Sequence, residues 1–303
     1  MTNLDIVEAR PEHAAAVAEL IHRSFAARPA VDPPATALTE DADSVVRAIT
    51  ESGGLVAFLD EQVVGSLLFD HSRDGWLGLR RVSVDPDHQE HGIASAIVGM
   101  AEEVAQRRES DGLWLWVREE LPDTARFWRR RGYVAVGRDG VHTVVQKPLP
   151  VRVDVVSADA MADLAGRLAT VLRAGDLLIL TGELGAGKTT FTQGLGEALG
   201  VRGPITSPTF VLSRIHPSLV GGPDLVHVDA YRLGSAAEVD DLDLDATADR
   251  SITVVEWGKD RAEQLAESWL ALAITGAADD LRRVTISPHG PRWADVALRS
   301  ALR

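Results

Sequence analysis

The 303-residue sequence contains no cysteine, and this absence removes several classes of site at once. Without thiols the chain forms no disulfide, has no thiolate nucleophile and offers no cysteine ligand to zinc. Tyrosine and methionine are also scarce, with two and three residues. Only three lysines occur, Lys147, Lys188 and Lys259, so nearly all positive charge is carried by arginine. A lysine that falls inside a recognisable motif is therefore unusually informative in this chain.

Long apolar stretches are missing too, and none could span a membrane. The first residues, Met1 to Asp5, have neither the basic start nor the apolar core of a signal peptide. We therefore expect a cytoplasmic location. The formal net charge is −14, and both halves of the chain are acidic. Because proteins that bind nucleic acid by themselves neutralise its phosphates with basic side chains, we expect no direct contact with nucleic acid.

The length and the content of apolar residues, 45%, predict two domains with substantial cores. The boundary is expected at Lys147-Pro148-Leu149-Pro150, since two prolines remove backbone donors and favour an extended path. This gives domains over 1–149 and 150–303. The first reads as a mixed α/β domain. The second alternates strands with helices, which favours a mostly parallel sheet covered by helices.

Hydrophobic periodicity places the expected elements. In the first half we expect helices at 12–26, 93–106 and 122–131, a loop at 28–43, and strands at 6–9, 55–59, 63–69, 78–84, 113–117, 133–136 and 141–145. In the second half we expect helices at 158–172 and 190–199, and strands at 151–156, 176–180, 225–228, 252–255, 269–275 and 283–287.

The clearest motif runs from Gly182 to Thr189 and fits G-x-x-x-x-G-K-[ST], the phosphate loop of nucleotide-binding proteins. An apolar strand enters it and a helical pattern leaves it. Glycines let successive N–H groups face a phosphate, and the helix N-terminus adds partial positive charge. Lys188 can reach the β- and γ-phosphates while the Thr189 hydroxyl holds Mg²⁺. The predicted ATP-binding residues of the loop are Gly185, Ala186, Gly187, Lys188, Thr189 and Thr190.

Two predicted strands of the second half end in a carboxylate, Asp229 and Glu256. Ligands of open α/β sheets lie beyond the carboxyl ends of the strands, so both acids could face the metal and the γ-phosphate. One could support Mg²⁺ and the other could orient an attacking water. Alternatively, each acid simply caps a strand exit. The hydroxyl-rich stretch 206–210 could sense the γ-phosphate, or be an ordinary turn.

These pieces together resemble the TsaE family, the small P-loop ATPases of bacterial tRNA threonylcarbamoyladenosine biosynthesis. The resemblance rests on Gly182 to Thr190, Thr206 to Phe210, His227 to Leu233 and Val255 to Gly258, and covers roughly residues 151–303. It implies a P-loop NTPase-like fold and a TsaB–TsaD partner complex that modifies the adenosine beside the anticodon. An ATPase that docks on proteins needs no basic tRNA surface of its own.

The resemblance also implies roles for single residues. Lys188 would bind phosphate, and Thr189 and Glu256 would hold Mg²⁺. Asp229 would orient water or support the metal, which makes Lys188, Asp229 and Glu256 the candidate catalytic residues. Trp257 and Lys259 would lie near the nucleotide, and the helix around Met161 near the adenine.

The second half could also serve one of two other functions. A stand-alone P-loop kinase would need an acceptor pocket and usually an arginine-rich lid, and no such lid is evident between Thr189 and Asp229. A GTP-dependent switch would need a base-specificity segment of N-K-x-D type, which the sequence lacks.

In the first half, the pattern from Val82 to Ala94 predicts a strand, then a loop, then a helix that starts at Gly92. N–H groups at that junction could hold a pyrophosphate. The Gln89-x-x-Gly92-x-Ala94 spacing and the segment from Ala125 to Tyr133 resemble the GNAT acetyltransferases over roughly residues 4–148. The resemblance implies a GNAT-like mixed α/β fold and acetyl-CoA binding by Val82, Val84, Gln89, Gly92, Ile93 and Ala94.

Two residues depart from the GNAT pattern. Trp128 replaces the tyrosine that often protonates the departing thiolate, and Leu121 replaces a frequent asparagine. An indole N–H cannot serve as that acid at neutral pH. Two interpretations stay open: an N-acetyltransferase in which a neutral amine attacks the thioester directly, or a domain that binds or docks without catalysis.

Overall fold

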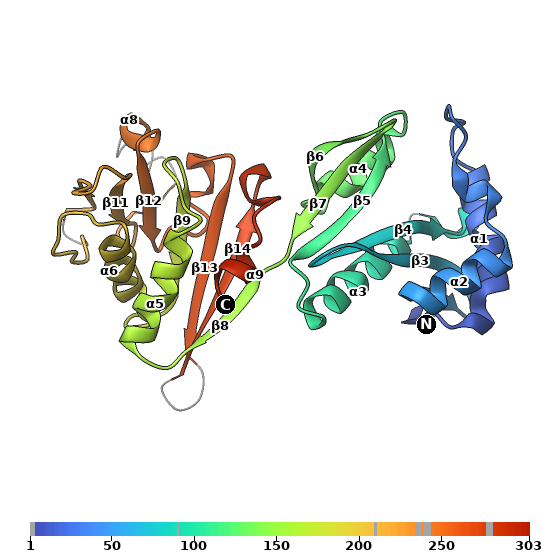
Figure 1. The fold of residues 1–303 in the computed structure, drawn as a ribbon, viewed down its shortest axis with the longest axis horizontal. Helices are drawn as coiled ribbons and strands as arrows, with labels where there is room; N and C mark the ends of the chain where they lie inside the picture. The colour runs from blue at the N-terminus through green and yellow to red at the C-terminus, as the bar shows by residue number, and fades with distance from the viewer. Residues whose placement is uncertain are drawn as a thin grey trace. The chain divides into compact units, whose positions relative to one another are not determined.

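The computed structural model describes residues 4–89, 91–208, 211–233, 235, 238, 244–276 and 281–303. The chain divides into two compact units, Met1–Leu149 and Pro150–Arg303, and each has a seven-stranded sheet (Figure 1). In the described part of the chain, no helix combines the length and apolarity needed to cross a membrane. The stretch 209–210 of the predicted hydroxyl-rich loop lies outside the described residues.

The first unit is a mixed α/β domain whose sheet has the strand order β1-β2-β3-β4-β5-β7-β6. Its strands are β1 (Leu4–Glu8), β2 (Gly54–Leu59), β3 (Gln62–Arg73), β4 (Trp76–Val84), β5 (Gly112–Arg118), β6 (Val134–Asp139) and β7 (His142–Pro148). Its helices are α1 (Ala14–Ala26), α2 (Ala42–Ser52), α3 (Ile93–Arg107) and α4 (Pro122–Arg130), with 3-10 turns η1 (Pro11–His13), η2 (Thr36–Thr39) and η3 (Pro86–His88).

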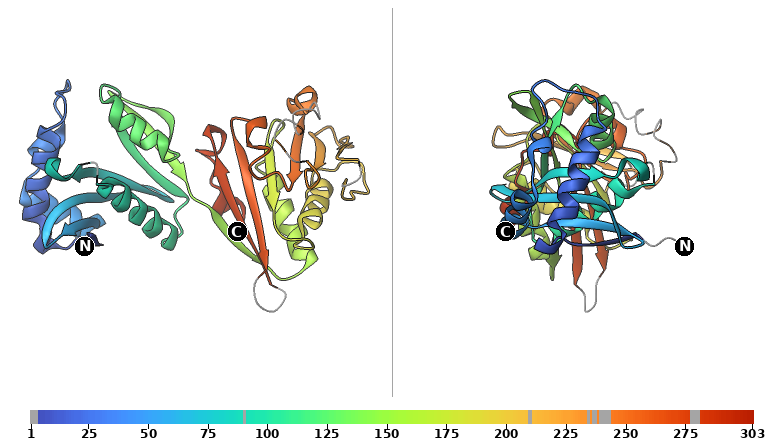
Figure 2. Two further views of the ribbon diagram at one scale, coloured as in Figure 1. Left: turned by 180° about the vertical axis from the view of Figure 1, so that it is seen from behind. Right: turned by 90° about the vertical axis from the view of Figure 1, so that its right-hand side faces the viewer.

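Strands β4 and β5 are the parallel pair of this sheet, and they separate soon after they meet. They are paired only from Trp76 to Gly78 on β4 and from Gly112 to Trp114 on β5. Figure 1, and the reverse view in Figure 2, show the two strands spreading apart from that point. A bulge at Arg81, whose φ is 52°, adds to the bend of β4. The divergence leaves one edge of β4 open.

Helices cover both faces of this first sheet. Alternate residues of β2 and β3 face opposite ways, so Leu55 and Leu67 pack with α3 and α4, whereas Val56 and Leu68 pack with α1 and α2. Helix α2 was not predicted, and the expected loop at 28–43 ends where it begins. Asp41 accepts a hydrogen bond from the Ser44 N–H and Ser44 accepts one from the Asp41 N–H, a capping box that marks the helix start.

The sheet of the second unit has the order β10-β11-β12-β9-β13-β14-β8. Its strands are β8 (Val151–Val155), β9 (Leu177–Thr181), β10 (Ser213–His216), β11 (Asp224–Asp229), β12 (Ser251–Glu256), β13 (Trp269–Gly276) and β14 (Arg282–His289). Its helices include α5 (Ala158–Ala169), α6 (Lys188–Ala198), α8 (Asp245–Ala248) and α9 (Leu298–Ala301), with 3-10 turns η4 (Glu263–Leu265) and η5 (Pro291–Trp293).

The expectation of a mostly parallel sheet was wrong. Strands β11, β12, β9 and β13 are parallel, but three of the six strand pairs, β10/β11, β13/β14 and β14/β8, are antiparallel. The alternation rule fails at the edges because β13 and β14 form a hairpin and β8 returns to the far side of β14. Strand β10, which the sequence did not predict, is a four-residue edge strand with little periodicity.

Helices α5 and α6 lie on one face of this sheet (Figure 1), where they enclose a core with Leu178, Leu180 and Val254. The opposite face carries Leu177, Ile179 and Val255, covered by residues that follow β11 and β12. The phosphate loop joins β9 to α6, so the rigid parallel core fixes both of its ends.

Helices α5 and α6 approach closely at Gly194. A Cβ atom at this position would lie 2.5 Å from the Cα and 2.9 Å from the Cβ of Ala162 on α5. At Gly166 on α5 an added Cβ would meet Ala198 at 3.9 Å, an ordinary van der Waals separation. The two glycines therefore have different reasons for their presence in the same helix pair.

Gly194→Ala is expected to destabilise the second unit by about 1–3 kcal/mol, because the added methyl group forces the helices apart. Gly166→Ala, the matched control, should stabilise it by about 0.5–1 kcal/mol, since alanine is the better helix former. Denaturant unfolding of the full chain measures both. Equal effects of the two substitutions would show that helix propensity, not close packing, dominates at Gly194.

Candidate functional site

The phosphate loop is built from glycines that adopt backbone angles unfavourable for other residues. Gly182, Gly185 and Gly187 have φ values of 151°, 78° and 108°. A Cβ atom on Gly182 would lie 2.5 Å from the carbonyl oxygen of Ile274, so the strand exit itself requires glycine. Helix α6 begins immediately after Gly187, and its first N–H groups lack intrahelical partners. The loop therefore has the cradle that a phosphate fits.

Lys188 is buried, with 5% of its surface exposed, at the centre of this loop. Its Nζ donates hydrogen bonds to the carbonyl oxygens of Gly182, at 2.8 Å, and Glu183, at 3.0 Å. The same Nζ lies 3.8 Å from the ring centroid of Trp257. Burial lowers the pKa of Lys188, and the nearby carboxylates of Glu256 and Asp229 partly oppose this effect. The site thus concentrates a desolvated cation and two anions.

Glu256 of β12 is linked by hydrogen bonds to α6 and to β11. Its Oε1 accepts a hydrogen bond from the Thr189 hydroxyl at 3.0 Å, and the same oxygen lies 2.9 Å from Nε2 of His227. An ionised carboxylate only accepts, so His227 donates through Nε2. His227 is fully buried and Glu256 is 3% exposed. His227 is thus packed in the core, and it also orients the carboxylate.

The donor atoms around Thr189 suit a magnesium ion. The threonine hydroxyl and the Glu256 carboxylate are hard oxygen ligands, the type that Mg²⁺ prefers, and they lie next to the phosphate cradle. Parallel register brings them there, because Glu256 of β12 is opposite Leu180 of β9 and beside Asp229 of β11. These residues fit the metal that the sequence implies.

Asp229 is held at the same sheet edge by the loop predicted to sense phosphate. Its Oδ2 accepts a hydrogen bond from the Ser207 hydroxyl at 3.0 Å, and its Oδ1 accepts one from the Tyr231 N–H at 3.0 Å. The second bond is the capping role considered as the alternative from the sequence. The first links the carboxylate to the stretch 206–208, so the two interpretations are compatible.

The remaining predicted nucleotide residues divide into two groups. Trp257, with φ of 62°, faces Lys188 and also contacts the ring of Tyr231, at a centroid distance of 5.3 Å. Met161 on α5 lies beside the phosphate loop, because an added Cβ on Gly187 would be 3.3 Å from its terminal methyl group. Lys259, in contrast, is exposed two positions beyond Trp257.

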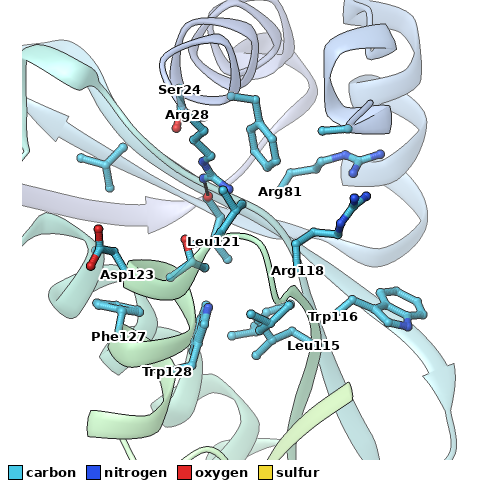
Figure 3. A pocket seen from close by; sticks show the side chains of 18 of the residues that line it. Ser24, Arg28, Arg81, Leu115, Trp116, Arg118, Leu121, Asp123, Phe127 and Trp128 are labelled. Carbon is cyan, nitrogen blue, oxygen red and sulfur yellow. Dashed lines mark hydrogen bonds between the residues drawn. The ribbon is translucent and has the colours of Figure 1, made fainter. Parts of the chain in front are cut away.

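The first unit contains a cavity of about 890 Å³ where β4 and β5 diverge (Figure 3). One wall is formed by the end of β4 and the start of α3. It includes every residue predicted for acetyl-CoA, namely Val82, Val84, Gln89, Gly92, Ile93 and Ala94. Leu121, Phe127 and Trp128 of the α4 segment line the cavity as well, as Figure 3 shows.

Gly92 is the start of α3 and fits a role next to a bulky ligand. Its φ of 76° favours glycine, and a Cβ atom there would meet no heavy atom within 4 Å. The position therefore opens onto free space beside the N-terminus of a 15-residue helix. The unpaired edge of β4 leads up to it, and an extended ligand could pair with that edge.

No tyrosine of this unit replaces the acid missing at Trp128. Tyr133 is 2% exposed, does not line the cavity, and its hydroxyl donates to Oε1 of Glu102 at 3.4 Å. Burial and the neighbouring Glu102 raise the pKa of Tyr133 well above its ordinary value. This tyrosine stabilises the core next to Trp128, with ring centroids 4.8 Å apart.

Sequence reasoning missed four arginines that line the cavity, Arg28, Arg80, Arg81 and Arg118. They come from distant parts of the chain, and Arg28 lies in a stretch predicted only as a loop. Periodicity holds no signal for such a cluster, because only the fold brings α1, β4 and β5 together.

Comparison with known proteins agrees with both halves of this description. A family model for "Threonylcarbamoyl adenosine biosynthesis protein TsaE" matches residues 155–284, and one for the "Acetyltransferase (GNAT) family" matches residues 16–133. The tRNA threonylcarbamoyladenosine biosynthesis protein TsaE of Streptomyces coelicolor is 59% identical over 139 residues, which cover 44% of this chain and 94% of the relative.

Two further similarities involve one half of the chain each. The protein of the same name from Bacillus subtilis is 37% identical over 139 residues, 46% of this chain and 85% of the relative. The PaiA N-acetyltransferase of Thermoplasma acidophilum, solved in complex with coenzyme A, is 16% identical with a TM-score of 0.44, over 48% of this chain and 99% of that one. The predicted resemblances and fold classes are confirmed: the chain belongs to the TsaE family, and it carries a domain of the GNAT acetyltransferase family ahead of the TsaE portion.

Proposed function

We propose that residues 150–303 are the ATPase that supports tRNA threonylcarbamoyladenosine synthesis by a TsaB–TsaD complex. The observation that carries the proposal is the hydrogen-bonded chain Thr189–Glu256–His227 beside the phosphate loop. A structural glycine turn needs no such arrangement of a hydroxyl, a buried carboxylate and a buried imidazole. Membership of the TsaE family supplies the biological setting.

The residues of the site have separable roles in this function. The glycines of the loop and the start of α6 bind phosphate oxygens, and Lys188 supplies a positive charge next to them. Thr189 and Glu256 hold the Mg²⁺, which when bound neutralises the charge that develops on the phosphates. Asp229 orients the attacking water or supports the metal. His227 fixes the Glu256 carboxylate through Nε2 and thereby keeps one of its oxygens toward Thr189.

The charge of the protein is consistent with a partner that is another protein. Exposed apolar side chains, Leu184 in the phosphate loop and Tyr231 after β11, lie on the elements that form the site. With a net charge of −14, the chain is poorly suited to binding tRNA by itself. We therefore expect the contact with tRNA to be made by the partner complex.

Lys188→Ala and Glu256→Gln are each expected to lower ATP hydrolysis by about 10²-fold or more, since Lys188 supplies positive charge to the transferring phosphoryl group and Glu256 would hold the Mg²⁺ that does the same. Glu256→Gln should also raise the Mg²⁺ concentration needed for half-maximal rate. Glu197→Gln removes an exposed carboxylate from α6, the helix that begins at Lys188. It serves as the control and should change neither the rate nor the Mg²⁺ requirement. Steady-state phosphate release at varied Mg²⁺ measures these effects.

Both site variants should bind acetyl-CoA as the wild type does, within about twofold, because their side chains contact only the second unit. Wild-type hydrolysis by Glu256→Gln at every Mg²⁺ concentration would contradict the metal role of this carboxylate.

The full chain should bind TsaB and TsaD in a pull-down, and both together should raise its rate of ATP hydrolysis. The reason is that a TsaE-type ATPase acts on the complex and not on tRNA directly. Omission of either partner is the control. A chain that hydrolyses ATP by itself, ignores both partners and phosphorylates a small molecule would instead be a kinase.

For the first unit we propose an acetyl-CoA-dependent N-acetyltransferase. The carrying observation is that all six predicted acetyl-CoA residues line one wall of one cavity, between the open edge of β4 and the start of α3. In this function the thioester lies in the divergence of β4 and β5. A neutral amine attacks the carbonyl carbon, a C–N bond forms as the C–S bond breaks, and the amine proton passes to the departing thiolate or to water.

The chain's own residues shape this reaction by position and exclusion of water. Leu115, Phe127 and Trp128 provide apolar walls, and Trp128 supplies no acid. Direct attack by a neutral amine requires none from the protein. The lack of a proton donor at Trp128 also favours a second candidate function, a domain that binds acetyl-CoA without turnover.

Acetyl-CoA should bind the full chain, and Gly92→Ala should weaken binding about tenfold, because a methyl group would stand between the ligand and the N–H groups of α3. Gly53→Ala is the matched control, since its φ of 81° makes it equally strained but it lies away from the cavity. Calorimetric titration measures both.

Release of CoA thiol in the presence of amines then separates the two candidates. The protein has no cysteine, so a thiol reagent reports CoA alone. Binding without thiol release from any amine would favour the non-catalytic domain. Failure to bind acetyl-CoA at all would contradict both.

A further inference from the structure

The cavity of the first unit has a second wall that the acetyl donor does not need. This wall is formed by the segment that follows α1, by Arg81 on β4 and by Arg118 on β5. In Figure 3, Arg28 extends from the segment that follows α1 toward Leu121, while Arg81 and Arg118 lie nearer Trp116. An acceptor that meets the thioester must enter along this wall.

Of the four arginines that line the cavity, three lie beside carboxylates of the protein itself, and Nη1 of Arg80 is 3.8 Å from Oδ2 of Asp70. Arg118 donates to Glu120 at 2.7 Å and to the carbonyl oxygens of Pro33 and Asp32 at 3.0 and 2.7 Å. Arg81 donates through Nε to Glu40 at 2.7 Å. These hydrogen bonds hold the segment after α1 against β4 and β5. Glu40 and Glu120 neutralise the charges of Arg81 and Arg118, so neither arginine is available to bind an anionic ligand.

Arg28 differs from these three arginines. Its Nη2 donates to the carbonyl oxygen of Val82 at 2.8 Å, and its guanidinium lies 3.8 Å from the ring centroid of Phe25. Among the described residues it forms no ion pair with a carboxylate, although the chain contains 45 acidic and 31 basic residues. A partly buried cation that faces a cavity in an acidic protein, without an anion of its own, is what a site for an anionic ligand requires.

The position of Arg28 also limits the ligand. Val82, to which it is bonded, belongs to the wall proposed for the acetyl donor, near the point where β4 and β5 separate. The Gly92 turn proposed for the pyrophosphate of CoA lies ten residues further along the chain. An anion bound by Arg28 would lie beside Val82, and we assign it to the acceptor because the donor's phosphates are already assigned to the Gly92 turn.

We propose that Arg28 binds the carboxylate of the acyl acceptor, and that the acceptor is a small amine with a carboxylate a few bonds from its nucleophilic nitrogen, such as an α-amino acid. This inference rests on the acetyl-transfer function proposed above. Burial lowers the pKa of Arg28 to about 10, so the guanidinium is desolvated yet charged at neutral pH. A planar guanidinium can hold a carboxylate through two parallel hydrogen bonds, which also orients the amine.

The test uses the full chain, acetyl-CoA and a panel of L-amino acids, each beside its carboxamide, with CoA release as the readout. At least one amino acid should be acetylated with a kcat/KM about tenfold or more above that of its amide. Arg28→Met, which keeps an apolar stem over Phe25, should reduce this ratio to near one through a higher KM for the acid. Arg28→Lys should retain part of the preference.

The matched control is Arg108→Met, another arginine stacked on a phenylalanine of this unit but outside the cavity. It should leave the ratio unchanged, and thermal unfolding should show that all variants fold. Amides acetylated as well as acids, no turnover of the panel despite bound acetyl-CoA, or a ratio unaffected by Arg28→Met would each overturn the inference. A loss of acetyl-CoA affinity in Arg28→Met would assign the arginine to the donor and overturn it as well. Failure of wild type to bind acetyl-CoA would instead refute the acetyl-transfer function itself.

Discussion

The parallel register of β9, β11 and β12 is the constraint on which the nucleotide site depends. It sets Glu256 beside Asp229 and opposite Leu180, at the edge from which the phosphate loop departs. Lys188 and Thr189 follow the loop into α6, so one shift of register would move Glu256, a proposed metal ligand, away from Thr189 and the phosphate loop. The hydrogen bonds of Glu256 to Thr189 and His227 are possible only in this alignment.

The first unit depends on an opposite device, the loss of pairing between two parallel strands. The hydrogen bonds between β4 and β5 end after Gly78. The unpaired edge of β4 and the space beside it form the cavity. The segment after α1 is then held across the opening by Arg81 and Arg118. The candidate site of the second unit thus depends on continuous parallel pairing, whereas the cavity of the first unit depends on the separation of two parallel strands.

Much of this was accessible from the sequence, and the failures have identifiable causes. The phosphate loop, Asp229 and Glu256 are local motifs at strand ends, so their spacing in the chain predicts their spacing in space. The Gly92 turn is equally local. The cavity wall that contains Arg28, Arg81 and Arg118 was not predicted, because it is formed by segments up to 90 residues apart in the chain. Helix α2 carried a readable signal in Asp41 and Ser44, whereas the antiparallel edges of the second sheet have no local signature.

The two sheets also differ in how they relate to the order of synthesis. In the first unit β1, β2, β3 and β4 are neighbours in sequence and in space, so most of the sheet can assemble as the chain emerges from the ribosome. In the second unit, among the strands that the structure describes, β8 comes first in the chain and pairs with β14, which comes last, with Val151 opposite Ile286. That sheet cannot close its edge until nearly the whole chain has been made, and closing so long a loop slows folding. An already folded first unit would therefore precede an exposed, unpaired β8 until β14 of the second unit has been made.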